Sequence, residues 1–173
     1  IGNLYEDRNG LIWCESTKGV CYFNPDDNFF QNISPGSAPG AEDNQLIATA
    51  AVERPDGKLW LAGGNGIYLY DPVGKRSLRH YANQAGKAPD LYDNNVRSLW
   101  LDRQGDLWAC TLKGVNRLRA GKEQFEFLGE KEGLAVNTYA MSVRQTRDGT
   151  IWIGDFSDAG HHYLLPGATR FLP

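Results

Sequence analysis

The sequence predicts an all-β fold, a β-propeller of four four-stranded antiparallel blades, and three observations lead to this prediction. A short motif recurs four times, tryptophan occupies one position of every copy, and Gly/Pro-rich stretches separate the apolar runs. A period of about 40 to 50 residues with four strands per copy is typical of propeller blades. Parallel βαβ repeats would need an amphipathic helix of about a dozen residues in each period, and the sequence has no such pattern.

The repeated motif places a glycine three residues before a tryptophan, with an aliphatic residue directly before the tryptophan. Successive copies are 47, 48 and 44 residues apart. Four of the five tryptophans fall in this one register, so chance does not explain the pattern. The pairs are Gly10/Trp13, Gly57/Trp60, Gly105/Trp108 and Gly149/Trp152.

Each copy is expected to contribute four strands. The first strand ends at a polar turn, where Asn9-Gly10, Asp56-Gly57 and Asp148-Gly149 predict hairpins and supply the positive φ angles that such turns require. The second strand carries the tryptophan on one face and an aliphatic residue on the other, so we expect both faces to be covered. Each indole would then be clamped between adjacent sheets in equivalent surroundings. The predicted blades span approximately residues 1–34, 44–82, 94–129 and 137–173.

In these aligned residues the repeat resembles the two-component regulator propeller family, over nearly the whole chain. That family's pattern runs from an Asp and a Gly through an aliphatic residue and Trp to a second Gly. Copies two and four depart from it, because Arg54 and Thr146 replace the Asp, and the last copy has a two-residue insertion in the segment 155–159 before its second Gly. The matching residues are Asp7, Gly10, Ile12, Trp13, Thr17 and Gly19 in the first copy, Gly57, Leu59, Trp60, Leu61, Gly66, Ile67 and Tyr70 in the second, Asp102, Gly105, Leu107, Trp108, Thr111, Gly114 and Val115 in the third, and Gly149, Ile151, Trp152, Ile153, Gly154 and Gly160 in the fourth.

The resemblance implies a ligand-sensing module in the periplasmic part of an inner-membrane protein, a histidine kinase or a diguanylate cyclase. Some such sensors respond to oligosaccharides. The implied partners are a small carbohydrate, the remaining propeller blades, C-terminal signalling domains and a second copy in a homodimer. Four copies are fewer than the roughly six to eight blades usual in such sensors, so we expect a piece of a larger propeller. A closed four-bladed ring or an oligomeric assembly is the alternative.

The composition of the chain argues against a nucleic-acid partner, a disulfide scaffold and a bound metal or cofactor. The net charge of −3 and the scatter of 18 Lys and Arg among 21 Asp and Glu argue against a nucleic-acid partner. Three cysteines are too few for a disulfide scaffold and lack the spacing of metal ligands, so we predict no cofactor and no metal. No run approaches the roughly 20 apolar residues that span a bilayer.

The candidate ligand site lies in the long connections between blades, at residues 32–44, 83–95 and 129–137. In a propeller these connections share one face with the loops between strands two and three, and loops on a rigid scaffold often bind ligands. The asparagines near their ends are either turn residues that begin each strand or a ring of amides for sugar hydroxyls, with tyrosines as stacking surfaces. These residues are Asn44, Asn94, Asn95 and Asn137, with Tyr92 and Tyr139.

Two other features resemble metal sites. The D-x-x-G turns look like calcium loops but lack the further carboxylates such a loop needs, so we interpret them as hairpin turns. His161 and His162 are either a surface irregularity or a metal or pH-sensitive site near Asp155 and Asp158. Adjacent strand residues point to opposite faces, which argues against one ion held by both histidines.

Two cysteines form the remaining candidate pair. Cys14 and Cys21 flank the turn at residues 17–18 symmetrically. They are either free thiols or a bridge across the hairpin, although cross-strand bridges strain the geometry that disulfides prefer.

Three functional interpretations stay open. The leading one is a sensor or ligand-recognition module that is not itself an enzyme. A propeller enzyme of the lyase or lactonase type would gather acids, histidines or metal ligands at the starts of the first strands. Ile47, Val96 and Tyr139 stand there instead. A protein-interaction scaffold would be favoured by a flat, apolar loop face.

Overall fold

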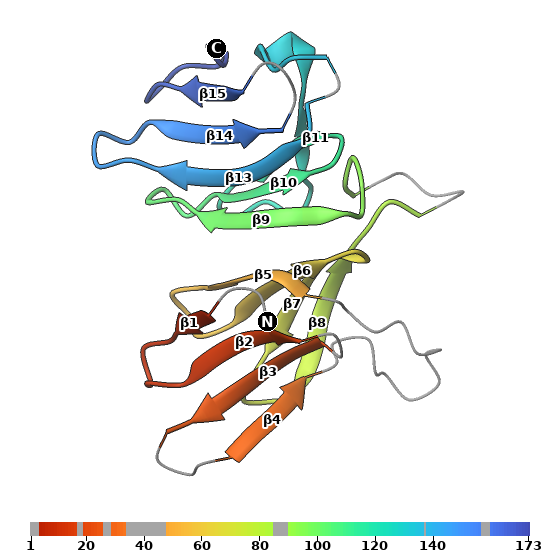
Figure 1. The fold of residues 1–173 in the computed structure, drawn as a ribbon, viewed down its shortest axis with the longest axis vertical. Coiled ribbons are helices and arrows are strands. Elements are labelled where there is room, and N and C mark those ends of the chain that lie inside the picture. Colours follow the sequence, from red (N-terminus) through yellow and green to blue (C-terminus); the bar gives the residue numbers. More distant parts are fainter. Residues whose placement is uncertain are drawn as a thin grey trace.

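The computed structural model describes residues 4–16, 19–25, 29–33, 48–84, 90–136, 138–156 and 160–173. In these residues the chain forms four antiparallel sheets, and the strands of each sheet are hydrogen-bonded in sequence order. Figure 1 shows the sheets following one another along the long axis of the molecule, from the N-terminal sheet to the C-terminal one. The predicted all-β architecture of consecutive antiparallel units is confirmed, but the last copy forms three strands instead of the predicted four, because its C-terminal segment pairs with β15 only through an isolated bridge.

Each sheet is one blade. Blade 1 contains β1 (Leu4–Glu6), β2 (Ile12–Ser16), β3 (Gly19–Asn24) and β4 (Phe29–Ile33). Blade 2 contains β5 (Ala48–Glu53), β6 (Leu59–Gly63), β7 (Gly66–Asp71) and β8 (Arg76–Tyr81). Blade 3 contains β9 (Val96–Leu101), β10 (Leu107–Thr111), β11 (Gly114–Leu118) and β12 (Glu126–Leu128), followed by the short 3-10 turn η1 (Glu130–Glu132). Blade 4 contains β13 (Ala140–Gln145), β14 (Ile151–Asp155) and β15 (His161–Leu164), and an isolated bridge joins Tyr163 to Leu172. The described part of the chain has no helix with the length and apolar character that crossing a bilayer requires.

The first glycine of each motif sits in a left-handed backbone conformation. Its φ is 77° at Gly10, 78° at Gly57, 84° at Gly105 and 93° at Gly149. The preceding Asn or Asp does not share this conformation, because Lys75 is the one non-glycine residue with positive φ in the described part. The prediction that both turn residues have positive φ is therefore wrong. Each hairpin is a tight turn followed by one left-handed glycine, which a residue with a Cβ adopts only at a cost.

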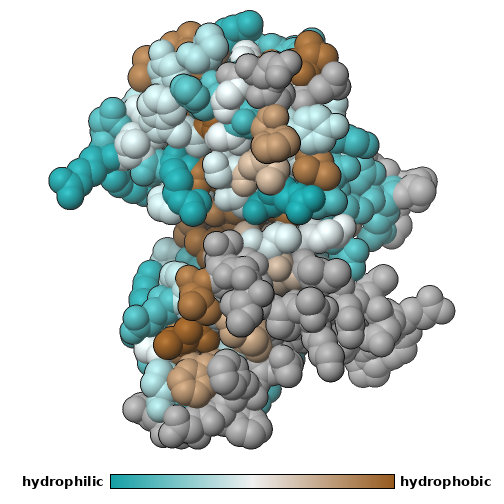
Figure 2. Space-filling model, viewed as in Figure 1, coloured by the Kyte–Doolittle hydropathy of each residue, from teal (hydrophilic) through white to brown (hydrophobic). Residues whose placement is uncertain are grey.

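The repeated tryptophans fill three blade junctions. The indoles of Trp13, Trp60 and Trp108 are 3%, 4% and 1% exposed. Each belongs to a core cluster with aliphatic side chains from the second strand of the following blade, so the predicted clamp between adjacent sheets is confirmed at these junctions. Figure 2 shows apolar side chains in the seam between blades 2 and 3. The clusters join Trp13 to Leu59 and Leu61, Trp60 to Leu107 and Ala109, and Trp108 to Ile151 and Ile153.

Trp152 does not share these surroundings. It is 39% exposed, and its partners are Tyr163, stacked at 5.1 Å between ring centroids, and His161 at 5.8 Å. The prediction of four equivalent indoles is wrong for this copy. The reason is positional, since each of the other indoles is covered by the next blade and no described sheet lies against this face of β14.

The first strands of blades 2, 3 and 4 share an irregularity that the motif does not encode. Each ladder shifts by one residue, and the extra residue stands eleven positions before the tryptophan. Bulges of this kind re-aim one side chain out of the ladder. In blade 2 the re-aimed residue joins two blades, because Thr49 Oγ1 donates a hydrogen bond to the carbonyl oxygen of Val96 at 2.5 Å. The extra residues are Thr49, Arg97 and Met141.

Candidate functional site

In the described residues, the connections that enter blades 3 and 4 lie on one face with the loops between second and third strands that they contact, as predicted. We call this the loop face and define it by residues 63–66, 82–84, 90–95, 111–114, 138–139 and 155–156. Backbone hydrogen bonds tie the connections between blades 2 and 3 and between blades 3 and 4 to a neighbouring hairpin, which holds these loops in register. They run from Gly66 to the carbonyl of Asn94 (2.9 Å), from Leu112 to Asn95 (3.3 Å) and from Phe156 to Tyr139 (3.0 Å).

The side-chain amide of Asn94 is engaged at both ends. Its Oδ1 accepts the backbone N–H of Asn83 at 2.6 Å, and its Nδ2 donates to the carbonyl oxygen of Asn83 at 3.0 Å. Asn83 in turn donates its amide to the carbonyl oxygen of Tyr92 at 3.2 Å. These bonds close the connection between β8 and β9. Asn94 therefore has the structural task of a turn residue.

The contacts of the other predicted asparagines are known only in part. The backbone N–H of Asn95 donates to Oδ1 of Asp93 at 2.8 Å, and the other oxygen of Asp93 lies 3.7 Å from Nζ of Lys113. Asn44 and Asn137 lie outside the described residues. The ring of amides therefore stays a prediction.

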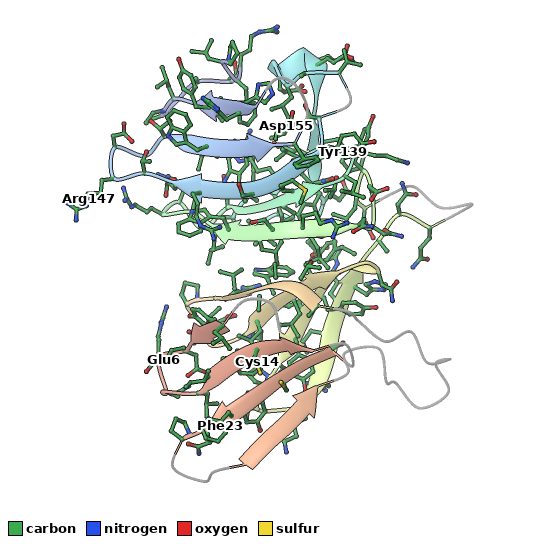
Figure 3. The ribbon with its side chains drawn as sticks, viewed as in Figure 1. Glu6, Cys14, Phe23, Tyr139, Arg147 and Asp155 are labelled. Carbon is green, nitrogen blue, oxygen red and sulfur yellow. The ribbon has the colours of Figure 1, made fainter. Side chains whose placement is uncertain are left out.

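The two predicted tyrosines present exposed rings from different connections. Tyr92, at the entry to blade 3, is 51% exposed and meets Phe127 edge to face at 5.8 Å. Tyr139, at the entry to blade 4, is 48% exposed, and its backbone N–H donates to Oδ1 of Asp155 at 2.9 Å. Figure 3 shows Tyr139 and Asp155 at one edge of the sheets and Arg147 at the opposite edge. Both rings stand on an anchored backbone and offer stacking surfaces.

Sequence reasoning missed the residue that anchors Tyr92. Asn116 of β11 is fully buried, and its Oδ1 accepts the backbone N–H of Tyr92 at 2.9 Å. Its Nδ2 has no hydrogen-bond partner among the described residues. The sequence feature that could have pointed to Asn116 is its polar side chain inside a predicted strand, two positions after Gly114, the second glycine of the motif.

The two histidines separate to opposite faces of β15. His162 is 3% exposed and lies between blades 3 and 4, with Nε2 3.6 Å from Oδ2 of the buried Asp155. Neither of its ring nitrogens forms a hydrogen bond within the described residues. His161 is exposed beside Trp152. The described residues contain no group of three side chains able to hold a metal ion, and Asp158 lies outside them.

Two grooves lie at the opposite edge of the sheets, beside the hairpins between first and second strands, where the sequence predicted no site. One of about 790 Å³ separates blades 3 and 4, and one of about 610 Å³ separates blades 2 and 3. Equivalent tryptophans line them, each with an arginine over its ring. Arg54 lies 5.6 Å from the centroid of Trp60, and Arg117 lies 4.7 Å from that of Trp108. Arg117 is also paired with Asp106, its Nε 2.9 Å from Oδ2, so its charge is compensated.

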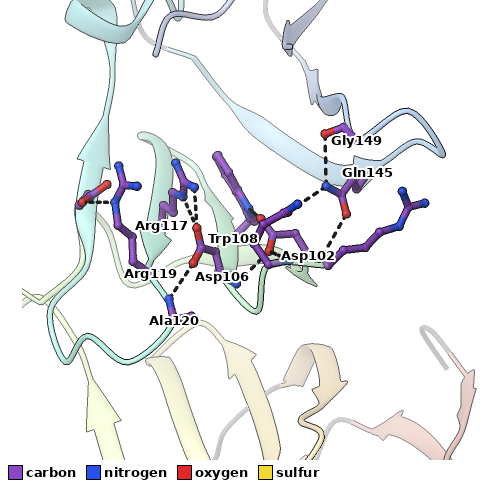
Figure 4. Close-up of polar contacts among 11 residues, drawn as sticks. Asp102, Asp106, Trp108, Arg117, Arg119, Ala120, Gln145 and Gly149 are labelled. Atoms are coloured by element: carbon purple, nitrogen blue, oxygen red, sulfur yellow. Dashed lines mark hydrogen bonds and ion pairs between the residues drawn. The ribbon is translucent and has the colours of Figure 1, made fainter. Parts of the chain in front are cut away.

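Both oxygens of the aspartate in the D-x-x-G turn of blade 3 accept hydrogen bonds from its own hairpin (Figure 4). Oδ1 of Asp102 accepts the backbone N–H groups of Gln104 and Asp106, both at 2.9 Å. Oδ2 accepts the indole N–H of Trp108 at 2.8 Å. These bonds agree with the interpretation as a hairpin turn instead of a calcium loop. Blade 1 repeats the indole bond, from Trp13 to Asp7 at 2.9 Å.

Comparison with known proteins identifies the fold but no family. No protein-family model and no curated protein matches the sequence. Among solved structures, the extracellular domain of BT3049, a proposed hybrid two-component system of B. thetaiotaomicron, matches 98% of this chain with a TM-score of 0.77 and 19% identity. The extracellular domain of BT4673, also a proposed hybrid two-component system of B. thetaiotaomicron, matches 98% with a TM-score of 0.78 and 16% identity.

This chain spans only 22% and 23% of the length of those two domains. Virginiamycin B lyase from Staphylococcus aureus, in a catalytically inactive form with quinupristin, matches 98% of the chain and 53% of its own length, with a TM-score of 0.65 and 11% identity. At these identities the likeness establishes the fold. The fold implied by the resemblance to two-component regulator propellers is confirmed.

Proposed function

We propose that this chain is a ligand-recognition module in the extracytoplasmic part of a bacterial membrane signal-transduction protein with a histidine kinase or diguanylate cyclase output. In this proposal the chain itself catalyses no reaction. The observation that carries the proposal is the likeness of 98% of the chain to the extracellular domains of two proposed hybrid two-component systems, with TM-scores of 0.77 and 0.78. The lyase of similar fold matches with a lower TM-score of 0.65.

The loop face supports recognition of a small polar ligand, and we propose an oligosaccharide as its class. Tyr92 and Tyr139 are about half exposed, while Asn116 and Asp155 hold their backbones. Aromatic rings pack against the apolar face of a ligand, and a few fixed polar groups orient it. A sugar ring combines an apolar face with hydroxyls and therefore fits this chemistry.

Calorimetric titration of the purified chain with a panel of oligosaccharides tests this proposal. We expect one class to bind, and the double variant Tyr92→Ala/Tyr139→Ala to bind roughly tenfold more weakly, because each lost ring contact is worth about 0.5–1.5 kcal/mol. Trp152→Ala is the matched control, since it removes an exposed aromatic ring that is not on the loop face. Unchanged affinity in the double variant, or an equal loss in the control, would contradict the proposed site.

The same samples separate the alternative functions. New products in mass spectra after incubation with oligosaccharides or lactones would favour an enzyme of the lyase or lactonase type. Binding of no small molecule, together with a stoichiometric protein complex from the native host, would favour a scaffold. Protease added outside the inner membrane of that host is expected to cleave these residues, and protection from it would contradict the extracytoplasmic location.

A further inference from the structure

We propose that Cys14 and Cys21 form a reversible disulfide across the β2–β3 hairpin of blade 1. The two residues are directly paired in the ladder, and their Sγ atoms lie 2.7 Å apart as thiols. A disulfide bond measures about 2.05 Å, so the sulfurs need to approach by only roughly 0.7 Å. The sequence left free thiols and a bridge as alternatives, and the register now favours the bridge.

The sulfur pair lies on the face of the hairpin that does not carry the junction with blade 2. Alternate residues of a strand project to opposite faces. The next cross-strand pair, Trp13 and Tyr22, stacks at 5.1 Å and belongs to the cluster that joins blades 1 and 2. A bond between the cysteines therefore forms without displacing that junction. Cys21 is 8% exposed and Cys14 is half-buried, so Cys14 is the sulfur that a small reagent reaches first.

The position of the pair makes the bond strained and therefore reversible. Directly opposed residues of antiparallel strands hold their Cβ atoms about 4.5–5.5 Å apart, whereas disulfides prefer about 3.5–4.5 Å. The hairpin has to tighten locally when the bond forms. Strained disulfides are more easily reduced than relaxed structural ones, so we expect a bond that responds to the thiol–disulfide balance around the protein.

The oxidant in this proposal is a small-molecule disulfide such as oxidised glutathione. The Cys14 thiolate attacks one sulfur of the reagent and displaces one reduced glutathione. The Cys21 thiolate then attacks Sγ of Cys14 in the mixed disulfide, forms the Cys14–Cys21 bond and releases the second reduced glutathione. Two electrons pass from the cysteines to the reagent, and the two cysteine protons end on the released thiols.

The third cysteine provides an internal control. Cys110 in blade 3 is fully buried, and this burial raises the pKa of its thiol well above the ordinary value. The thiolate is the reactive form, so Cys110 should stay reduced. Burial, followed by the hydrogen bond with Cys21, raises the pKa of Cys14 to about 11. Oxidation should therefore be slow at neutral pH and accelerate about tenfold per pH unit below that value.

The test exposes the reduced full chain to mixtures of oxidised and reduced glutathione and follows the intact mass and the peptide map without reductant. We expect loss of two hydrogen atoms per chain, a linked peptide pair containing Cys14 and Cys21, and full reversal by excess reduced glutathione. Cys110→Ser should behave in the same way. Cys14→Ser and Cys21→Ser should not form the bond, while near-ultraviolet circular dichroism shows that both remain folded.

Several outcomes would overturn the proposal. Three thiols remaining after oxidation, a stable glutathione adduct on Cys14 of the unsubstituted chain, or a bond between two chains would each refute the internal bridge. A bond that persists in excess reduced glutathione would refute its reversibility. Because the experiment uses purified chain and no ligand, its failure is distinct from failure of the oligosaccharide titration.

Discussion

The aspartate that opens the D-x-x-G turn is bonded to the tryptophan six residues later. In blades 1 and 3 one carboxylate oxygen accepts N–H groups of the turn and the other accepts the indole N–H. Copies two and four replace this residue. Arg54 lies over the ring of Trp60, and Thr146 bonds to Asp148 and Thr150 within its own turn. The six-residue spacing between the Asp and the Trp of the motif thus allows the turn and the indole to be hydrogen-bonded to the same carboxylate.

Replacing Asp102 with Ala should lower the free energy of unfolding by about 2 kcal/mol, because the indole N–H and two backbone N–H groups lose a buried acceptor. Chemical denaturation measures this loss. Asp148→Ala is the matched control, since that carboxylate is exposed and accepts hydrogen bonds from Thr146 and Thr150 of its own turn instead of from an indole. An equal loss in both variants would show that the indole bond contributes nothing.

The second strand of each blade was expected to be apolar on both faces and covered on both. Strands β6 and β10 are buried at every residue. Strand β14 is buried at Ile151 and Ile153 and exposed at Trp152. The three strands therefore place their aliphatic residues on one face and their tryptophan on the other in the same way. They differ in whether a described sheet covers the tryptophan face.

Trp108→Ala should destabilise the protein by about 3–5 kcal/mol, because it removes a buried indole from the junction between blades 3 and 4. Trp152→Ala should cost roughly 1–2 kcal/mol, since more than a third of that side chain is already in water. Thermal and urea unfolding of the two variants gives the comparison. If Trp152→Ala were as destabilising as Trp108→Ala, Trp152 would have a structural partner that its exposure does not reveal.

The whole molecule is an array in which each described blade packs on its sequence neighbours. In the described part of the chain, core clusters fall between blades 1 and 2, 2 and 3, and 3 and 4. The bond from Thr49 to Val96 adds a polar link between blades 2 and 3. Stability in such arrays is close to a sum of repeat and nearest-neighbour terms.

Trp60→Ala should therefore act locally along the array. We expect the amides of β5–β11 to lose hydrogen-exchange protection, while those of β13–β15 keep theirs, because the Trp108 cluster that holds blade 4 is intact. Hydrogen exchange followed by mass spectrometry resolves the blades. Equal loss of protection in all blades would indicate one cooperative unit instead of an array.

Several site contacts were beyond prediction from the sequence for a common reason. Asn94 was recognisable as a loop residue, but its partner Asn83 lies eleven positions away, and the path of the connection decides whether they meet. The polar position of Asn116 was visible, yet its bond to Tyr92 depends on how the connection crosses the end of β11. The grooves beside Trp60 and Trp108 are each lined by residues of two blades, so they depend on how neighbouring blades pack.

The sequence by itself determined the repeat, the hairpin positions, the alternation of apolar faces and the symmetric placement of Cys14 and Cys21. These depend on local spacing, because turns and strand alternation are encoded within a few residues. Only the tertiary structure decided that Trp152 is exposed and that Asn116 meets the backbone of Tyr92. Burial and contact depend on which sheet or strand lies opposite, and a side chain's own sequence neighbours do not specify that.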